Sequence, residues 1–169
     1  MSNTQKTYAG KIVLWGVKTN HDVRPIRQTT VQYLINLLNF PADTVDYYTT
    51  VPVMEKLIYD GLAVPQINTY SMASAREFLN AVEQSDTACI MIDYQQIISY
   101  IINDPACRSL EDFMLQLKNI LQKNQKLAII TAYVSSDFDG SKLPDWMLKL
   151  QPFALDINFD AKLLHCSRK

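Results

Sequence analysis

The sequence predicts an α/β domain of three layers, in which helices cover both faces of a mostly parallel sheet. Short apolar runs alternate along the chain with segments whose apolar residues recur at helical spacing. This alternation is typical of parallel strands joined by crossover helices. The last two strand candidates lie close enough in sequence to pair as an antiparallel C-terminal hairpin. A length of 169 residues suits a single domain with a single core.

The first half of the chain predicts three strands and three helices, after a polar tail at residues 1–9 that we expect to be flexible. Residues rich in β-formers mark the strands, which are 11–15, 44–48 and 66–70. Pro25 suits the first turn of one helix, and Asp60 followed by Gly61 suits the end of another. The expected helices are 25–38, 53–59 and 75–82.

The second half contains the clearest helix, residues 110–123. Ser109 is its expected N-cap, and Glu111 and Asp112 place negative charge in its first turn. Its apolar residues form one stripe. The other expected helices are 95–102 and 144–150, and the expected strands are 87–92, 126–131, 153–159 and 162–166.

Composition excludes several classes of protein. A net charge of −1 gives no general attraction to nucleic acid or anionic membrane. No apolar run approaches the roughly 20 residues that a membrane helix needs, and the polar start has no signal core. The three cysteines are odd in number and far apart, which favours a reducing compartment. We therefore expect a cytoplasmic protein that does not insert into membranes.

Three segments of the chain have the order and spacing of the nucleotide-site motifs of one ATPase family. Residues 11–16 are a strand that runs into Gly16 at the place of a phosphate loop. Residues 88–97 are similar to a Walker B strand, whose apolar run ends here at Asp93. The helix 110–123 and the following strand are similar to those that carry a polar sensor residue, here Thr131. Together these segments resemble the RecA-like ATPases, especially RadA-type repair proteins and DnaB-type replicative helicases. The resemblance covers nearly the whole chain and implies a single RecA-like domain over residues 1–169.

The phosphate loop of that family departs from its pattern here. A working loop reads G-x-x-x-x-G-K-[ST], and its lysine neutralises the phosphates. With Gly16 as the first glycine, His21 takes the place of the second and Asp22 takes the place of the lysine. Like charges about 4 Å apart repel by roughly 4 kcal/mol at an effective dielectric constant of about 20. We therefore interpret Gly16, His21, Asp22, Asp93 and Thr131 as relic nucleotide-site positions.

Other catalytic or cofactor chemistry has little support in the sequence. The catalytic glutamate of the family follows its second strand, where residues 49–52 contain no carboxylate. His21 and His165 are the only histidines, and neither belongs to a cysteine pattern that binds zinc. We expect no catalytic residue, no metal site and no cofactor, so the chain is predicted not to be an enzyme.

Asp93 and Thr131 each have two interpretations. Asp93 is either a Mg²⁺ ligand or a residue at a strand end that caps the following turn, and we favour the cap. Thr131 is either a relic sensor or an ordinary β-branched strand residue, and we favour the latter.

Aromatic and basic residues near the expected loops are candidates for contacts with a protein partner, because tyrosine, tryptophan and arginine dominate interface hot spots. The candidates are Arg24, Arg27, Tyr94, Tyr133 and Trp146. The loop 135–142 contains two aspartates and one lysine, so nucleic-acid binding is expected to be weak or absent. The leading hypothesis is a non-catalytic RecA-like subunit that acts through protein interaction, regulation or structure in a homo- or hetero-oligomer.

Two alternatives remain open at this point. One is a nucleotide-binding ATPase with a non-standard phosphate loop, in which Lys18 and Thr19 replace the usual pair. The other is a pseudo-receiver signalling domain with Asp93 as phosphoacceptor, because residues 129–132 resemble the Thr-Ala strand end of response regulators. That alternative lacks the acidic pair after the first strand and the Lys-Pro of the last one.

Overall fold

The computed structural model describes residues 7–19, 45–48, 66–68, 74–135, 143–159 and 165–167. Most expected elements within these ranges are confirmed, with boundaries that shift by a few residues. In chain order the elements are β1 (Ile12–Thr19), β2 (Val45–Tyr48), β3 (Gln66–Asn68), α4 (Ala75–Gln84), β4 (Cys89–Asp93), α5 (Tyr94–Ile102), α6 (Leu110–Asn124), β5 (Leu127–Ser135), α7 (Asp145–Leu150), the 3-10 turn η2 (Gln151–Phe153), β6 (Asp156–Phe159) and β7 (His165–Ser167). The expected helices 25–38 and 53–59 lie outside the described residues.

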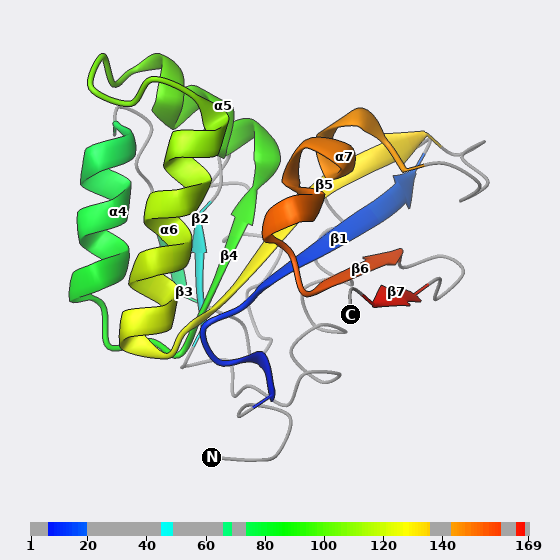
Figure 1. Ribbon diagram of the computed structural model, residues 1–169, viewed down its shortest axis with the longest axis horizontal. Helices are drawn as coiled ribbons and strands as arrows, with labels where there is room; N and C mark the ends of the chain where they lie inside the picture. Colours follow the sequence, from blue (N-terminus) through cyan, green and yellow to red (C-terminus); the bar gives the residue numbers. More distant parts are fainter. Residues whose placement is uncertain are drawn as a thin grey trace.

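The strands form one seven-stranded sheet in the order β3-β2-β4-β5-β1-β6-β7. Every neighbouring pair from β3 to β6 is parallel, which confirms the mostly parallel sheet. β6 and β7 pair antiparallel, with Asp156 opposite Ser167, and the residues that join them lie outside the described ranges. Strand β1, which is blue in Figure 1, lies between β5 and β6.

This strand order contradicts the pseudo-receiver alternative. Receiver domains are flavodoxin-like, with five parallel strands in the order 2-1-3-4-5, so their first strand pairs with the second. Here β1 pairs with β5 and β6, and β2 pairs with β3 and β4. The sequence of the strand end at residues 129–132 was therefore a misleading signal, because a short strand motif contains no information about sheet order.

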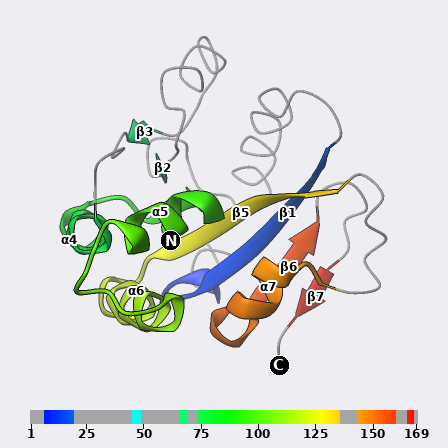
Figure 2. The same ribbon diagram turned by 90° about the horizontal axis from the view of Figure 1, so that it is seen from above.

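The described helices α4, α5, α6 and α7 lie on one side of the sheet (Figure 2). Alternate strand residues face them, and these belong to the main core cluster with helix residues: Ile12, Leu14, Ile90, Ile92, Ala128 and Ile130. The intervening strand residues point to the other face and are buried as well: Val13, Trp15, Cys89, Met91, Leu127 and Ile129. Burial on both faces explains why these strands are continuous apolar runs and do not alternate with polar residues.

Phe78 of α4 is the centre of an aromatic group in this core. Its ring stacks on Tyr100 of α5 at 5.0 Å and on Phe113 of α6 at 5.8 Å between centroids. Tyr48 of β2 meets it edge-on at 4.9 Å. One side chain thus joins three helices to the sheet, in the geometries that aromatic pairs prefer.

The ends of α6 explain how the chain turns back into the sheet. The hydroxyl of Ser109 accepts a hydrogen bond from the backbone nitrogen of Asp112 at 3.1 Å, which confirms the expected N-cap. At the other end Gln125 has a φ of 55°, a left-handed conformation that is common after a helix. The backbone nitrogen of Lys126 then donates to the carbonyl of Leu121 at 2.9 Å, and β5 begins at the next residue.

The structure describes the expected tail, residues 1–9, only from Thr7 on, and its flexibility stays a prediction. Thr7 and Tyr8 are helical, and Ala9 and Gly10 form a turn that leads into β1. The backbone nitrogen of Gly10 donates to the carbonyl of Lys126 at 2.9 Å. Gly10 has a φ of 77°, and a Cβ added there would lie 3.3 Å from Cα of Gln122. The positive φ therefore favours glycine, and the close approach of α6 leaves little room for a side chain.

Two expected boundaries were wrong. β1 does not end near Gly16 but continues to Thr19, and β5 continues beside it to Ser135. The paired ladder satisfies the backbone of both strands, so the glycine does not interrupt it. The expected strand 153–159 begins only at Asp156, because Gln151–Phe153 form a 3-10 turn with a proline in its first positions.

Candidate functional site

The carboxyl ends of parallel strands share one edge of a sheet, and ligands of open α/β sheets bind outside that edge. β4 ends at this edge with Asp93. The register places Asp93 beside Thr131 of β5, and Thr131 beside Trp15 of β1. Asp93 and Thr131 belong to the sheet face that points away from the described helices, because they continue the alternation of Cys89, Met91 and Ile129.

Two hydroxyl groups donate hydrogen bonds to the same oxygen of Asp93. Thr131 Oγ1 lies 2.9 Å from Asp93 Oδ1, and the Tyr47 hydroxyl lies 3.0 Å from it. All three side chains are buried, with Asp93 and Thr131 each 6% exposed and Tyr47 1% exposed. We call these three residues the Asp93 cluster. It joins β2, β4 and β5 through charge-assisted hydrogen bonds, which are stronger than neutral ones.

The cluster corrects the favoured interpretation of Asp93 and adds a contact to that of Thr131. Asp93 occupies the N-cap position of α5, but its side chain makes no capping hydrogen bond and turns to the two hydroxyl groups. Thr131 is a strand residue, as expected, but its hydroxyl holds Asp93. In each case the partner lies 38 or more residues away in sequence, so local pattern could not identify it.

Tyr47 is a member that sequence reasoning did not find. The pair Tyr47 and Tyr48 stands in a short β-rich segment, and successive strand residues point to opposite faces. One tyrosine therefore faces the helices, and the other points to the opposite face of the sheet. In the structure Tyr48 faces the helices and Tyr47 reaches Asp93. Only the register of β2 on β4 decides which of the two reaches the carboxylate.

Gly16, the expected first residue of a phosphate loop, lies inside a ladder. It pairs with Ala132 of β5 on one side and with Phe159 of β6 on the other. The next three residues, through Thr19, continue to pair with β5. A strand directs its successive N–H groups to alternate sides, whereas a phosphate loop directs several of them at one point. His21 and Asp22, which the sequence also predicted to be relic positions, lie outside the described residues.

The candidate interaction residues are only partly described. Tyr94 of α5 and Trp146 of α7 pack against each other with ring centroids 5.7 Å apart, and each is 9% exposed. They join two helices within the core cluster, and their role in partner binding stays a prediction. Tyr133 lies in β5, where it pairs with Val17. Arg24 and Arg27 lie outside the described residues.

A second polar network lies at the opposite, amino-terminal edge of the sheet. Asp46 Oδ2 accepts hydrogen bonds from Ser85 Oγ and Thr87 Oγ1, each at 2.9 Å. Lys126 is buried, and its ammonium group donates to the carbonyls of Val82 at 2.8 Å and of Ser85. Burial lowers the pKa of Lys126, while the nearby charge of Asp46 opposes that shift. The network fixes the carboxyl end of α4 to β2 and β5, a structural role that sequence reasoning also missed.

The described cysteines have the properties of core residues. Cys89 and Cys107 are free and buried. Burial raises the pKa of Cys89 far above its ordinary value, and the charge of Asp46 adds to that shift. Burial also raises the pKa of Cys107. Neither thiol has the lowered pKa that a cysteine nucleophile needs. No group of three or more His, Cys, Asp or Glu side chains in the described ranges is arranged to hold a metal ion.

Within the part of the chain that the structure describes, no helix has the length and apolar character needed to cross a membrane.

Comparison with known proteins identifies the fold. No protein family model matches the chain, and no curated protein sequence matches it. Solved structures do match. A flagellar accessory protein FlaH from Methanocaldococcus jannaschii has a TM-score of 0.52 at 16% identity over 89% of this chain and 71% of that one. A KaiC-like protein from Pyrococcus horikoshii has a TM-score of 0.57 at 14% identity over 95% of this chain and 79% of that one.

A third match is a DnaB-like replicative helicase whose structure describes its interactions with primase. Its TM-score is 0.58 at 12% identity, over 90% of this chain and 47% of the helicase, so this chain spans about half of the helicase. The three matched proteins have the RecA-like ATPase fold. This chain has the RecA-like fold. Because one fold supports many functions, sequence identities of 12 to 16% show a shared fold and no shared function.

Proposed function

We propose that this chain is a non-catalytic RecA-like protein that acts as a protein-interaction, regulatory or structural subunit. The single observation that carries the proposal is the continuation of β1 through Gly16 to Thr19. These residues occupy the first half of the expected phosphate loop, and they are paired with β5. A segment held in a ladder does not wrap around phosphates without breaking those backbone hydrogen bonds.

The Asp93 cluster and the sequence of the loop support the same proposal. Asp93, at the Mg²⁺ position of the resemblance, accepts hydrogen bonds from two protein hydroxyls. Asp22 places a carboxylate where a phosphate-binding loop has its lysine. A chain with these features keeps the framework of an ATPase without the groups that hold the triphosphate.

The alternative function is a nucleotide-binding ATPase with a non-standard loop. It is favoured by one observation, the direct contact between Asp93 and Thr131. The resemblance assigns a Mg²⁺ ligand and a polar sensor to these two positions, so an acidic and a hydroxyl side chain do meet where that chemistry needs them. This alternative requires the β1 ladder beyond Gly16 to open when a triphosphate binds.

Isothermal titration calorimetry of the full chain with ATP and with GTP, each with Mg²⁺, separates the two functions. We expect no binding tighter than about 100 μM, which corresponds to roughly −5.5 kcal/mol. Tighter binding that disappears in Asp93→Asn would establish the alternative. Asp46→Asn is a matched control, because it changes a second buried carboxylate that lies at the opposite edge of the sheet.

The oligomeric part of the proposal has its own test. Size-exclusion chromatography with light scattering is expected to show a homo-oligomer, or a larger complex when the chain is purified from its native cells. A strictly monomeric chain that co-purifies with no protein in stoichiometric amount would contradict an interaction role. The proposal also includes a reducing, cytoplasmic compartment, which the free thiols of Cys89 and Cys107 support.

A further inference from the structure

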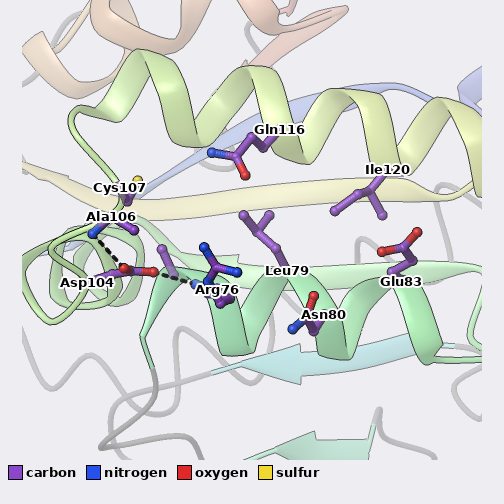
Figure 3. A pocket seen from close by; sticks show the side chains of 10 residues that line it. Arg76, Leu79, Asn80, Glu83, Asp104, Ala106, Cys107, Gln116 and Ile120 are labelled. Carbon is purple, nitrogen blue, oxygen red and sulfur yellow. Dashed lines mark hydrogen bonds between the residues drawn. The ribbon is translucent and has the colours of Figure 1, made fainter.

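A groove of about 220 Å³ lies on the outer surface of the helix layer, between α4 and α6. Figure 3 shows side chains of both helices pointing into it, among them Arg76 and Leu79 of α4 and Gln116 of α6. The loop between α5 and α6 closes one end with Asp104 and Cys107. The groove is remote from the Asp93 cluster in the fold, because that cluster faces the other side of the sheet.

Among the described residues, the two carboxylates at the groove have hydrogen-bond partners, whereas its one lining cation has none. Glu83 pairs with Lys123 of α6 at 3.0 Å. The carboxylate of Asp104 accepts hydrogen bonds from the backbone nitrogens of Arg76 at 2.8 Å and of Ala106 at 3.0 Å. The guanidinium of Arg76 has no hydrogen-bond or ion-pair partner among the described residues, and the Arg76 side chain is exposed. The guanidinium of Arg76 therefore presents several N–H donors in one plane at the edge of the groove, and this arrangement suits a carboxylate.

The floor beside Arg76 is apolar. Leu79 is buried, and Ile120 of α6 packs against the core next to it. On α4, Arg76, Leu79, Asn80 and Glu83 recur at helical spacing, so the groove follows the helix for about two turns, or about 10 Å. Sites for whole small molecules usually exceed about 300 Å³, and this groove is smaller. Its size suits one or two side chains of a peptide.

We propose that the α4–α6 groove binds an acidic peptide segment of a protein partner, with a carboxylate on Arg76 and an aliphatic side chain over Leu79 and Ile120. The proposal rests on the proposed function, because it names a surface through which an interaction subunit contacts its partner. The bound segment is a helix that carries Asp or Glu three or four residues away from Leu, Ile or Met. That spacing in the peptide matches the distance along α4 between Arg76 and Leu79.

The test is a selection of peptides on the full chain. A displayed library of random peptides of about twelve residues is expected to yield an acidic and aliphatic pair at that spacing. The enriched peptide, synthesised with a fluorescent label, is expected to lose affinity about tenfold or more on Arg76→Ala in an anisotropy titration. Lys149→Ala is the matched control, because it removes an exposed cation on α7 outside the groove, and it should leave the affinity unchanged.

A charge exchange makes the test independent of folding. Arg76→Glu should abolish binding of the acidic peptide, and a peptide with Lys in place of its acidic residue should recover binding to that variant. Failure to enrich any sequence, a basic consensus, or equal affinity for Arg76→Ala would overturn the groove proposal. None of these results bears on triphosphate binding, so the calorimetric test of the proposed function can succeed while the groove fails.

Discussion

The hydroxyl of Thr131 donates to Oδ1 of Asp93 over 2.9 Å, between two neighbouring strands and 38 residues apart in sequence. Tyr47 reaches the same oxygen from β2, on the other side of β4. One buried carboxylate thus joins three strands at the carboxyl edge of the sheet, outside which open α/β sheets bind their ligands.

Thr131→Val keeps the shape of the side chain and removes its hydroxyl. We expect the free energy of unfolding to fall by about 1.5–3 kcal/mol, because a hydrogen bond to a charged buried group is lost. Urea denaturation followed by circular dichroism measures the change. A loss smaller than about 0.5 kcal/mol, the range of ordinary surface substitutions, would contradict the role of this contact.

Tyr47→Phe removes the second donor and allows a double-mutant cycle with Thr131→Val. The two hydroxyls share one acceptor oxygen, so their effects on unfolding should not be additive. We expect a coupling energy of about 0.5 kcal/mol or more between them. Additive effects within the error of denaturation curves would show that each hydroxyl interacts with Asp93 independently.

Lys126→Met removes the ammonium group that meets the carbonyls of Val82 and Ser85 at the end of α4. We expect a loss of about 1–3 kcal/mol in unfolding free energy, because buried carbonyls lose their partner. Lys123→Met is the matched control. It breaks an ion pair whose lysine side chain is 71% exposed, so its cost should stay below about 1 kcal/mol. Equal effects of the two changes would contradict the structural role of Lys126.

Cys89 should make the domain sensitive to alkaline pH. Burial raises its pKa, so the folded state keeps a proton that the unfolded state loses above the ordinary pKa near 9. The unfolded state then binds fewer protons, and stability falls as pH rises above 9, by about 1.4 kcal/mol per pH unit. Thermal denaturation from about pH 8 to about pH 10.5 should show a shallower decline for Cys89→Ala than for the unchanged chain. Parallel declines would be inconsistent with a buried, protonated thiol.

Gly10→Ala should destabilise the connection from the N-terminal turn to β1. The backbone φ of 77° is unfavourable for alanine, and its Cβ would lie 3.3 Å from the backbone of Gln122. We expect a loss of more than about 1 kcal/mol in unfolding free energy. Gly140→Ala lies in the predicted polar loop 135–142 and should cost less in the same assay. A neutral or stabilising effect of Gly10→Ala would contradict this turn geometry.

Much of the local structure followed from the sequence because its causes are local. Ser109 with Glu111 and Asp112 predicted the start of α6, and the structure has the cap. Apolar runs such as residues 87–92 predicted buried strands, because a strand covered on both faces has no polar side. The alternation of strands and helices predicted the mostly parallel sheet, which the strand pairing confirms.

The errors arose where pairing between distant strands overrides local signals. Gly16 was expected to end β1, but it pairs with β6 as well as β5, and the ladder with β5 continues through it to Thr19. The strand end at 129–132 allowed a receiver-like interpretation, and only the order of strands excluded it. Asp46 and Lys126 lie in one polar network although 80 residues separate them, and no periodicity indicates such a meeting.

By itself the sequence determined the class of fold, the N-cap of α6, the buried strands and two of the three members of the Asp93 cluster, Asp93 and Thr131. Tertiary structure alone decided that Thr131 and Tyr47 hold Asp93, that Gly16 lies within a ladder, and that α4 and α6 enclose a groove with Arg76 at its edge. The physical reason is the distance along the sequence over which each interaction acts. Propensity, capping and amphipathicity act over a few residues, whereas register and packing join residues that only the folded chain brings together.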